Sequence, residues 1–322
     1  MVLDIRQLHI TFNTHVAPLE VVRGVNLTVN LGEIVGLVGE SGSGKSATAQ
    51  AIMQLLQDAE IRGKILFHGE DLLAKSPREI EAIRGSQIGM MFQDSNAALN
   101  PTMSIGDQIT EGLLKHRRLK RGDAFQKGVE MLFNLGVNNP VGRMNQFAHE
   151  LSGGIRQRIM LAIAMACGPD LIIADEPTTA VDVITQAQIL QLLKNLHTSI
   201  LFITHDLNLI SKIADRIYVM YAGKIVESSH TQELFESPKH PYTKALLEST
   251  PNLAGSHLKI IEGSPPSPFH FPSGCAFHPR CPDALQICSL KDPDGISLNS
   301  CWKYQPREIH DTHTNQSAVK TV

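Results

Sequence analysis

Glycines, a lysine and a serine near the N-terminus have the types and spacing that could hold phosphate groups. Residues 39–46, Gly-Glu-Ser-Gly-Ser-Gly-Lys-Ser, match the pattern G-x-x-x-x-G-K-[ST] at every fixed position. Glycine tolerates backbone conformations in which successive N–H groups point inward at phosphate oxygens. We expect Lys45 to reach the β- and γ-phosphates of a nucleotide and the Ser46 hydroxyl to ligate Mg²⁺. The residues predicted to bind nucleotide here are Gly39, Ser41, Gly42, Ser43, Gly44, Lys45, Ser46 and Ala47.

Two acidic residues follow another apolar run, residues 171–174, and could supply hydrolytic chemistry. In open α/β sheets, ligands bind outside the carboxyl ends of the strands, so Asp175 and Glu176 should face the phosphate loop. Asp175 would hold Mg²⁺ through water, and Glu176 would polarise the water that attacks the γ-phosphate, which is general-base work. Acidic capping of a helix start is the alternative. The presence of Lys45 favours the catalytic interpretation.

A third candidate is the octapeptide at residues 151–158, Leu-Ser-Gly-Gly-Ile-Arg-Gln-Arg, which leads into a helical pattern. Gly153 and Gly154 leave the backbone open to close approach, and a helix start of this kind offers peptide N–H groups to an anion. Together with the Ser152 hydroxyl, they could hold a γ-phosphate that the chain's own loop does not bind. The alternative is a plain helix capped by Ser152.

Strands and helices in alternation must position these groups. Short apolar runs rich in β-branched residues occupy 34–38, 88–92, 171–174 and 199–204, and helical patterns occupy 47–56 and 155–167. The runs at 88–92 and 199–204 deliver Gln93 and His205 to the edge that carries the acidic pair. The alternation and the phosphate-binding pattern predict an α/β fold with a P-loop NTPase core.

The length of 322 residues suggests about two domains at roughly 150 residues each. The 322 residues include 29 Lys and Arg against 32 Asp and Glu, so no polycationic surface for nucleic acid is implied. The longest apolar runs, such as 161–167, fall far short of the ~18 residues that a membrane helix needs. The N-terminus lacks the basic start and apolar run of a secretory signal. We therefore expect a cytoplasmic protein whose membrane association comes through another protein.

With the octapeptide as signature motif, the phosphate loop and the acidic pair resemble the ATP-binding cassette (ABC) family. The resemblance implies ATP and Mg²⁺ as ligands. It also implies that Gln93 senses Mg²⁺ and the attacking water, and that His205 contacts the γ-phosphate. The implied Mg²⁺ ligands are Ser46, Gln93 and Asp175, and the implied catalytic residues are Glu176, His205, Lys45 and Gln93.

The resemblance further implies a partner cassette, because in this family the signature closes over nucleotide held by a second cassette. The residues expected to act there are Ser152, Gly153, Gly154 and Gln157. Residues 179–182 resemble the family's D-loop, with Asp182 retained and Val181 where leucine is usual. Phe12 resembles the aromatic residue that stacks on adenine, and a core phenylalanine is an equal alternative. A helical subdomain inserted over about residues 94–164 would carry nucleotide closure to a membrane partner.

The chain beyond residue 225 narrows the resemblance. Residues 237–247, Ser-Pro-Lys-His-Pro-Tyr-Thr-Lys-Ala-Leu-Leu, are similar to the segment that follows the cassette in oligopeptide and dipeptide importers, a group that includes nickel importers. Residues 69–73 and 100–106 match the D-type ATP-binding subunit better than the F-type. This implies an ATPase that energises peptide uptake from the cytoplasmic face of the inner membrane. Its implied partners are an F-type ATPase, two permeases and an extracytoplasmic substrate-binding protein.

Two alternatives to peptide import stay open. Nickel or another small solute could be the cargo, because cassettes do not contact it. A protein of another class, an ABC ATPase acting in DNA repair or translation, would usually add long coiled coils or a second cassette, and this sequence has neither.

Four of the five cysteines gather after a proline-rich connector at residues 263–268, and they are Cys275, Cys281, Cys288 and Cys301. Disulfides are disfavoured in a reducing compartment, and structural zinc would more often show C-x₂-C pairs. The importer resemblance implies a [4Fe–4S] cluster on these four thiolates. Zinc and reduced thiols remain the alternatives.

We expect three parts in this chain. Residues 1–250 would form the ABC ATPase domain, and residues 251–304 a connector followed by a small cysteine-rich extension. Residues 305–322 are polar and aperiodic, which predicts a disordered tail.

Overall fold

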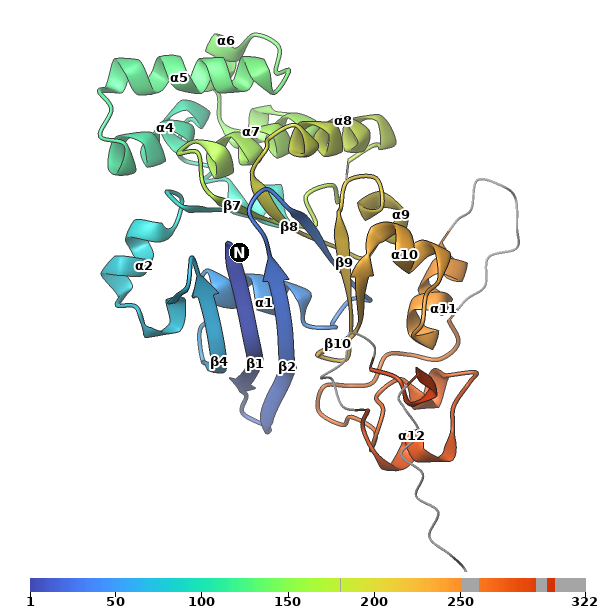
Figure 1. The fold of residues 1–322 in the computed structure, drawn as a ribbon. Helices are drawn as coiled ribbons and strands as arrows, with labels where there is room; N and C mark the ends of the chain where they lie inside the picture. Colours follow the sequence, from blue (N-terminus) through green and yellow to red (C-terminus); the bar gives the residue numbers. More distant parts are fainter. Residues whose placement is uncertain (180, 251–260, 294–299, 305–322) are drawn as a thin grey trace, which may run out of the picture.

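The structure is a computed structural model that describes residues 1–179, 181–250, 261–293 and 300–304 of the chain. Its centre is a six-stranded sheet in the order β10-β9-β3-β8-β7-β6 (Figure 1). These strands are β3 (Ile34–Val38), β6 (Ile88–Met91), β7 (Leu171–Asp175), β8 (Ser199–Thr204), β9 (Arg216–Tyr221) and β10 (Lys224–His230). Neighbours pair in parallel except β9 and β10, which are antiparallel. The predicted α/β class is confirmed.

The central strands are short apolar runs because both faces of the sheet are covered. Every residue of β3, β7 and β8 is buried. The predicted bounds of β3 and β8 are confirmed, and β7 runs one residue further than predicted, to Asp175. The predicted run at 88–92 is one residue too long, because β6 ends at Met91 and the Phe92 side chain is exposed.

A second, antiparallel sheet in the order β2-β1-β4-β5 packs beside the first. Its strands are β1 (Leu3–Asn13), β2 (Pro18–Val29), β4 (Ala59–Phe67) and β5 (Glu70–Asp71). Buried side chains of the two sheets and of helix α1 (Lys45–Ile52) form one apolar cluster. The apolar runs identified in the sequence all belong to the six-stranded sheet.

The helices between β6 and β7 gather at one end of the molecule (Figure 1). They are α3 (Ser95–Ala98), α4 (Ile105–His116), α5 (Arg121–Asn134), α6 (Pro140–Met144) and α7 (Gly153–Met165), with a 3₁₀ turn at Ala148–Glu150. The side chains of Ser104 and Asn139 cap α4 and α6 by accepting backbone N–H groups. Buried residues such as Ile109 and Leu132 join these helices to the apolar core under the parallel sheet.

The remaining helices flank the sheets and the C-terminal part of the chain. They are α2 (Pro77–Ile83), α8 (Val183–Lys194), α9 (Leu207–Ile210), α10 (Thr231–Glu236), α11 (Pro241–Ser249) and α12 (Gln286–Leu290), with 3₁₀ turns at Leu72–Ala74, His278–Arg280 and Trp302–Tyr304. The segment around α12 lies at the opposite end of the molecule from α4, α5 and α6 (Figure 1). In the described ranges, the helices are too short or too polar to cross a membrane.

Two predicted helices are shifted. Helix α1 begins at Lys45 and ends at Ile52, four residues before the predicted end, because Gln54 has a left-handed φ of 48° that stops the helix. Helix α7 covers 153–165 where 155–167 was predicted, because its two glycines already adopt the helical conformation. The predicted tail at 305–322 and the start of the connector at 251–260 lie outside the described residues.

Gly89 lets α7 pack directly on β6, because a Cβ at this position would lie 2.1 Å from the carbonyl oxygen of Ala164. We expect Gly89→Ala to lower the free energy of unfolding by about 1–3 kcal/mol, as overpacked cores do. Gly122→Ala is the matched control, since that glycine lies on the exposed side of α5 with open space around it. Urea unfolding of both variants measures the difference, and equal stabilities would contradict the packing argument.

Candidate functional site

The phosphate loop lies between β3 and α1, and its glycines are required by the backbone. Gly44 caps α1 with a left-handed φ of 104°. A Cβ on Gly39 would lie 2.1 Å from the Met220 carbonyl oxygen, and a Cβ on Gly44 would lie 2.6 Å from that of Val21. Any other residue at these positions would therefore displace β9 or β2 from the loop.

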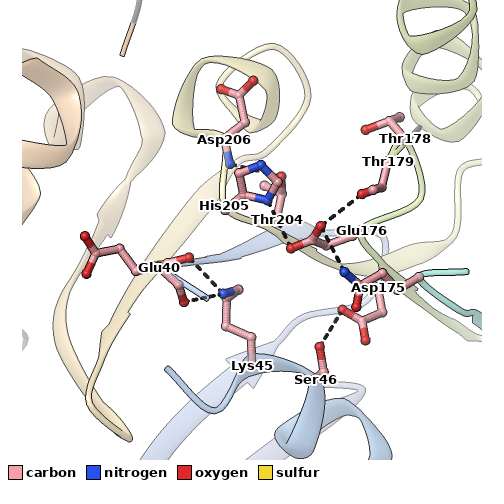
Figure 2. Close-up of polar contacts among 12 residues, drawn as sticks. Glu40, Lys45, Ser46, Asp175, Glu176, Thr178, Thr179, Thr204, His205 and Asp206 are labelled. Atoms are coloured by element: carbon pink, nitrogen blue, oxygen red, sulfur yellow. Dashed lines mark hydrogen bonds and ion pairs between the residues drawn. The ribbon is translucent and has the colours of Figure 1, made fainter. Parts of the chain in front are cut away.

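Lys45 extends under the phosphate loop and is buried. Its Nζ donates hydrogen bonds to the carbonyl oxygens of Gly39 at 2.8 Å and Glu40 at 2.9 Å (Figure 2). Burial lowers the pKa of Lys45, and the carboxylates of Glu176 and Asp175 oppose this effect. Phosphate oxygens are stronger acceptors than these carbonyls, so the lysine is placed to bind them.

Ser46, in the first turn of α1, lies beside Asp175, the last residue of β7. The Ser46 hydroxyl donates to Oδ1 of Asp175 at 3.1 Å (Figure 2). Burial raises the pKa of Asp175, and the Ser46 hydrogen bond opposes this effect. A hydroxyl and a carboxylate that converge in this way are the hard oxygen ligands that Mg²⁺ prefers.

Both the backbone and the carboxylate of Glu176 are fixed by contacts with neighbouring residues. Its φ of 45° is left-handed, and its N–H donates to the carbonyl oxygen of Ile203 at 2.9 Å. Its carboxylate accepts from the Thr179 hydroxyl at 2.9 Å and lies 3.0 Å from Nδ1 of His205 (Figure 2). The amide nitrogen of Gln93 lies 3.5 Å from the same carboxylate. A strained backbone held by this many partners is typical of a functional site.

The structure thus brings together the candidate residues that were predicted at the ends of four separate strands. It also adds residues that sequence reasoning missed. Thr179, three residues after Glu176, donates a hydrogen bond to the Glu176 carboxylate. Arg280 and Tyr242 contact Glu40 of the phosphate loop. The proximity of Thr179 could have been inferred from its spacing, but no sequence signal connects residues 40 and 280.

The signature residues lie at the start of α7. Ser152 is the exposed N-cap residue, and within the described residues its hydroxyl makes no capping hydrogen bond. A Cβ on Gly154 would lie 2.8 Å from Cγ2 of Thr185 on α8. Gln157 is buried, and its Oε1 has no hydrogen-bond partner in the described part of the chain. The exposed helix start therefore leaves the Ser152 hydroxyl available to a ligand.

Asp182 caps a helix, and Phe12 packs against the apolar core. Asp182 caps α8 by accepting the N–H of Thr185 at 2.9 Å and its hydroxyl at 2.7 Å. The next two residues, Val183 and Ile184, are exposed apolar side chains. Phe12 is half-buried on β1 and packs against the core shared by the two sheets. Its contact with adenine and the D-loop role of Asp182 stay predictions, and residue 180 of that loop lies outside the described ranges.

The four C-terminal cysteines converge on one small cavity. Cys275, Cys281, Cys288 and Cys301 line it together with His240, Phe277 and Trp302. Burial raises the pKa of Cys275 to about 11, so this thiol is protonated at neutral pH. All are free cysteines. In the described ranges, no group of three or more His, Cys, Asp or Glu side chains is arranged to hold a metal ion. The predicted convergence is therefore present, but the geometry of a ligand set is not.

Taken together, the fold and the site define a P-loop nucleotide hydrolase. Residues 22–179 match the ABC transporter family, and residues 226–288 match the C-terminal region of oligopeptide/dipeptide transporters. The chain is 44% identical to the dipeptide transport ATP-binding protein DppD of Bacillus subtilis, over 96% of both chains. It belongs to the ABC transporter family, and it is an ATPase of the ABC type.

Other relatives agree with this assignment. The oligopeptide transport ATP-binding protein OppD of Bacillus subtilis is 48% identical, and the match covers 90% of this chain and 84% of that protein. Among solved structures, the dimeric bacterial ABC transporter cassette MJ0796 is 27% identical with a TM-score of 0.65. That match covers 71% of this chain and 98% of the cassette. A second structure of the same cassette is a post-hydrolysis state bound to ADP and Pi.

Proposed function

We propose that this chain is the ATP-hydrolysing subunit of an importer that energises uptake of dipeptides or oligopeptides. The observation that carries the proposal is the convergence of Gln93, Thr179 and His205 on the Glu176 carboxylate, beside a buried Lys45. The peptide substrate is supported by the match at residues 226–288 and by the names of the dipeptide and oligopeptide transport relatives.

Each residue of the site has one task in this function. Lys45 binds the phosphates of ATP from a buried position beside the carboxylates of Asp175 and Glu176. Glu176 polarises the attacking water as general base, and Thr179 holds its carboxylate in place. His205, which lies 3.0 Å from the same carboxylate, would contact the γ-phosphate. Ser46, Gln93 and Asp175 would hold Mg²⁺, whose positive charge would offset the charge on the phosphates.

The second cassette completes the site. Ser152, Gly153 and Gly154 would bind the γ-phosphate of ATP held by the other subunit, which agrees with the exposed start of α7. The dimeric cassette MJ0796 supports such an arrangement. We propose an F-type ATPase as the other subunit, two permeases that receive the motion through the helical subdomain at about 94–164, and an extracytoplasmic substrate-binding protein. The chain would then lie peripherally on the cytoplasmic face of the inner membrane.

Purification from native membranes tests this assignment. A tagged copy of the chain, extracted with mild detergent, is expected to bring down two permeases that span the membrane several times, in amounts that nuclease treatment does not change. Copurification of ribosomes or DNA that nuclease removes would contradict the proposal and favour the alternative class of ABC ATPase.

We also propose that Cys275, Cys281, Cys288 and Cys301 hold a [4Fe–4S] cluster. Their placement around one cavity supports this, because four thiolates are the usual ligand set for such a cluster. Ligation would require each thiol to lose its proton, which reverses the effect of burial on the pKa of Cys275. Cys275 and Cys281 on one loop, Cys288 on α12 and Cys301 would supply the four thiolates.

Chemical analysis of protein purified without oxygen tests the cluster. We expect about four iron and four acid-labile sulfide per chain, and far less iron in Cys288→Ser. Cys167→Ser is the matched control, because that cysteine is buried in the core beside α4. Zinc in place of iron would support the alternative metal, and the absence of both would show that these cysteines are reduced structural thiols.

A further inference from the structure

Glu40, the second residue of the phosphate loop, is held by the C-terminal part of the chain. The guanidinium of Arg280 donates to both carboxylate oxygens of Glu40, from Nη1 at 2.8 Å and from Nη2 at 3.1 Å. The hydroxyl of Tyr242 accepts the Glu40 N–H at 2.9 Å. The Glu40 carbonyl accepts from Lys45, as Figure 2 shows. The same residue therefore connects the C-terminal segment to the lysine that binds phosphate.

The Arg280–Glu40 pair differs from an ordinary surface ion pair. The side chain of Arg280 is 6% exposed and that of Glu40 is 23% exposed. Two parallel hydrogen bonds between a guanidinium and a carboxylate fix the direction of both groups, which a lysine cannot do. Removing one member of a buried pair leaves the other charge without compensation, whereas exposed pairs contribute little.

Tyr242 is fixed just as firmly. The buried carboxylate of Glu227 on β10 accepts the N–H groups of Lys239 and His240 at 2.7 and 2.8 Å, which sets the start of α11. Tyr242 follows in the first turn of that helix and is fully buried. Its hydroxyl consequently meets the Glu40 N–H in one defined position.

The loop that carries Arg280 packs behind these groups. Phe277 lies between Cys275 and Cys281 in the sequence, and its ring contacts Tyr221 at 5.3 Å and Tyr242 at 5.4 Å between centroids. The hydroxyl of Tyr221 in turn accepts a hydrogen bond from Arg280 at 3.3 Å. The end of β9, the start of α11 and the loop at 275–281 thus form one packed unit against the phosphate loop.

We propose that Arg280 is a positioning residue for ATP binding, and that the cysteine-rich extension sets nucleotide affinity through it. A phosphate loop held in its binding conformation does not have to be ordered when ATP arrives, so its affinity is higher. Without the Arg280–Glu40 ion pair, the phosphate loop would lose one of the contacts that keep its carbonyl groups and Lys45 in place. The inference rests on the proposed ATPase function and adds a part of the chain outside the cassette to its site.

Replacing Arg280 in the full chain tests the proposal. We expect Arg280→Gln to weaken MgATP binding about 3- to 30-fold, measured by titration calorimetry, the range seen for residues that act through others. The Michaelis constant should rise by a similar factor while kcat changes far less. Arg280→Lys should recover only part of the affinity, because lysine keeps the charge and loses the paired hydrogen bonds.

The matched control lies in the same extension. Lys303 pairs with Asp283 at 2.8 Å, and both side chains are more than a third exposed. Lys303→Gln is expected to bind ATP as the unaltered chain does. An Arg280→Gln variant that also binds ATP like the unaltered chain would overturn the proposal.

A second variant approaches the pair from the loop side. We expect Glu40→Gln to weaken ATP binding, and the double variant Glu40→Gln, Arg280→Gln to bind no more weakly than the worse single variant. Fully additive losses would overturn the proposal even if Arg280→Gln misfolds part of the extension. A wild-type chain that binds no ATP would instead overturn the proposed function, so the two failures are distinguishable.

Discussion

Replacing Glu176 by glutamine is expected to lower the turnover number for ATP by about 10²- to 10⁴-fold, the usual contribution of a general base. Glutamine has nearly the same shape, so the contacts with Thr179 and His205 can be kept in part. It lacks the negative charge that polarises water. ATP binding should be retained because Lys45 and the loop N–H groups are unchanged.

Phosphate release by the purified complex and calorimetric ATP binding measure the two effects of Glu176→Gln separately. Glu60→Gln is the control, because Glu60 lies on β4 in an exposed pair with Arg62. A Glu176→Gln complex that turns over ATP at the normal rate would show that another group activates the water.

We expect Gly153→Asp to lower ATP hydrolysis about 10²- to 10³-fold. This is the usual effect of losing one hydrogen-bond donor to the charge that develops in the transition state. The new carboxylate would sit on the N–H groups at the start of α7 and compete with the γ-phosphate of the partner's ATP. This chain's own phosphate loop is untouched. ATP binding to the isolated chain should therefore stay unchanged while hydrolysis by the complex falls.

Gly122→Asp provides the same substitution in the first turn of another helix, since Gly122 is the second residue of α5 and is exposed. Equal hydrolysis by the Gly153→Asp and Gly122→Asp complexes would show that the signature of this chain does not act on bound ATP. Weaker ATP binding by the isolated Gly153→Asp chain would show that the signature does not act only in trans.

The catalytic cluster could be predicted because its information is local. Lys45 and Ser46 belong to one motif, and the other members each follow an apolar strand directly. Parallel strands bring their carboxyl ends to one edge, so the ends of β6, β7 and β8 suffice to place Gln93, Asp175, Glu176 and His205 near each other. The buried strands could be predicted for the same reason, since burial on both faces gives an unbroken apolar run.

Other features depend on contacts between distant parts of the chain. The antiparallel sheet pairs β1 with β4 across the whole phosphate loop, and its half-exposed strands lack a continuous apolar run. The Arg280–Glu40 pair joins residues that lie 240 positions apart, and no sequence pattern indicates that they meet. The cysteines could be predicted to converge, but the orientation of their sulfur atoms depends on the loop at 275–281 and on α12.

ATP hydrolysis by the complete transporter in lipid vesicles tests the central claim most directly. The vesicles would contain this chain with its partner ATPase and permeases, and dipeptide would be added with the substrate-binding protein. The proposed function predicts that dipeptide-loaded binding protein stimulates hydrolysis and that Glu176→Gln in this chain abolishes the stimulation. An ATP hydrolysis rate that dipeptide does not change, or stimulation that remains in Glu176→Gln, would contradict the proposed function.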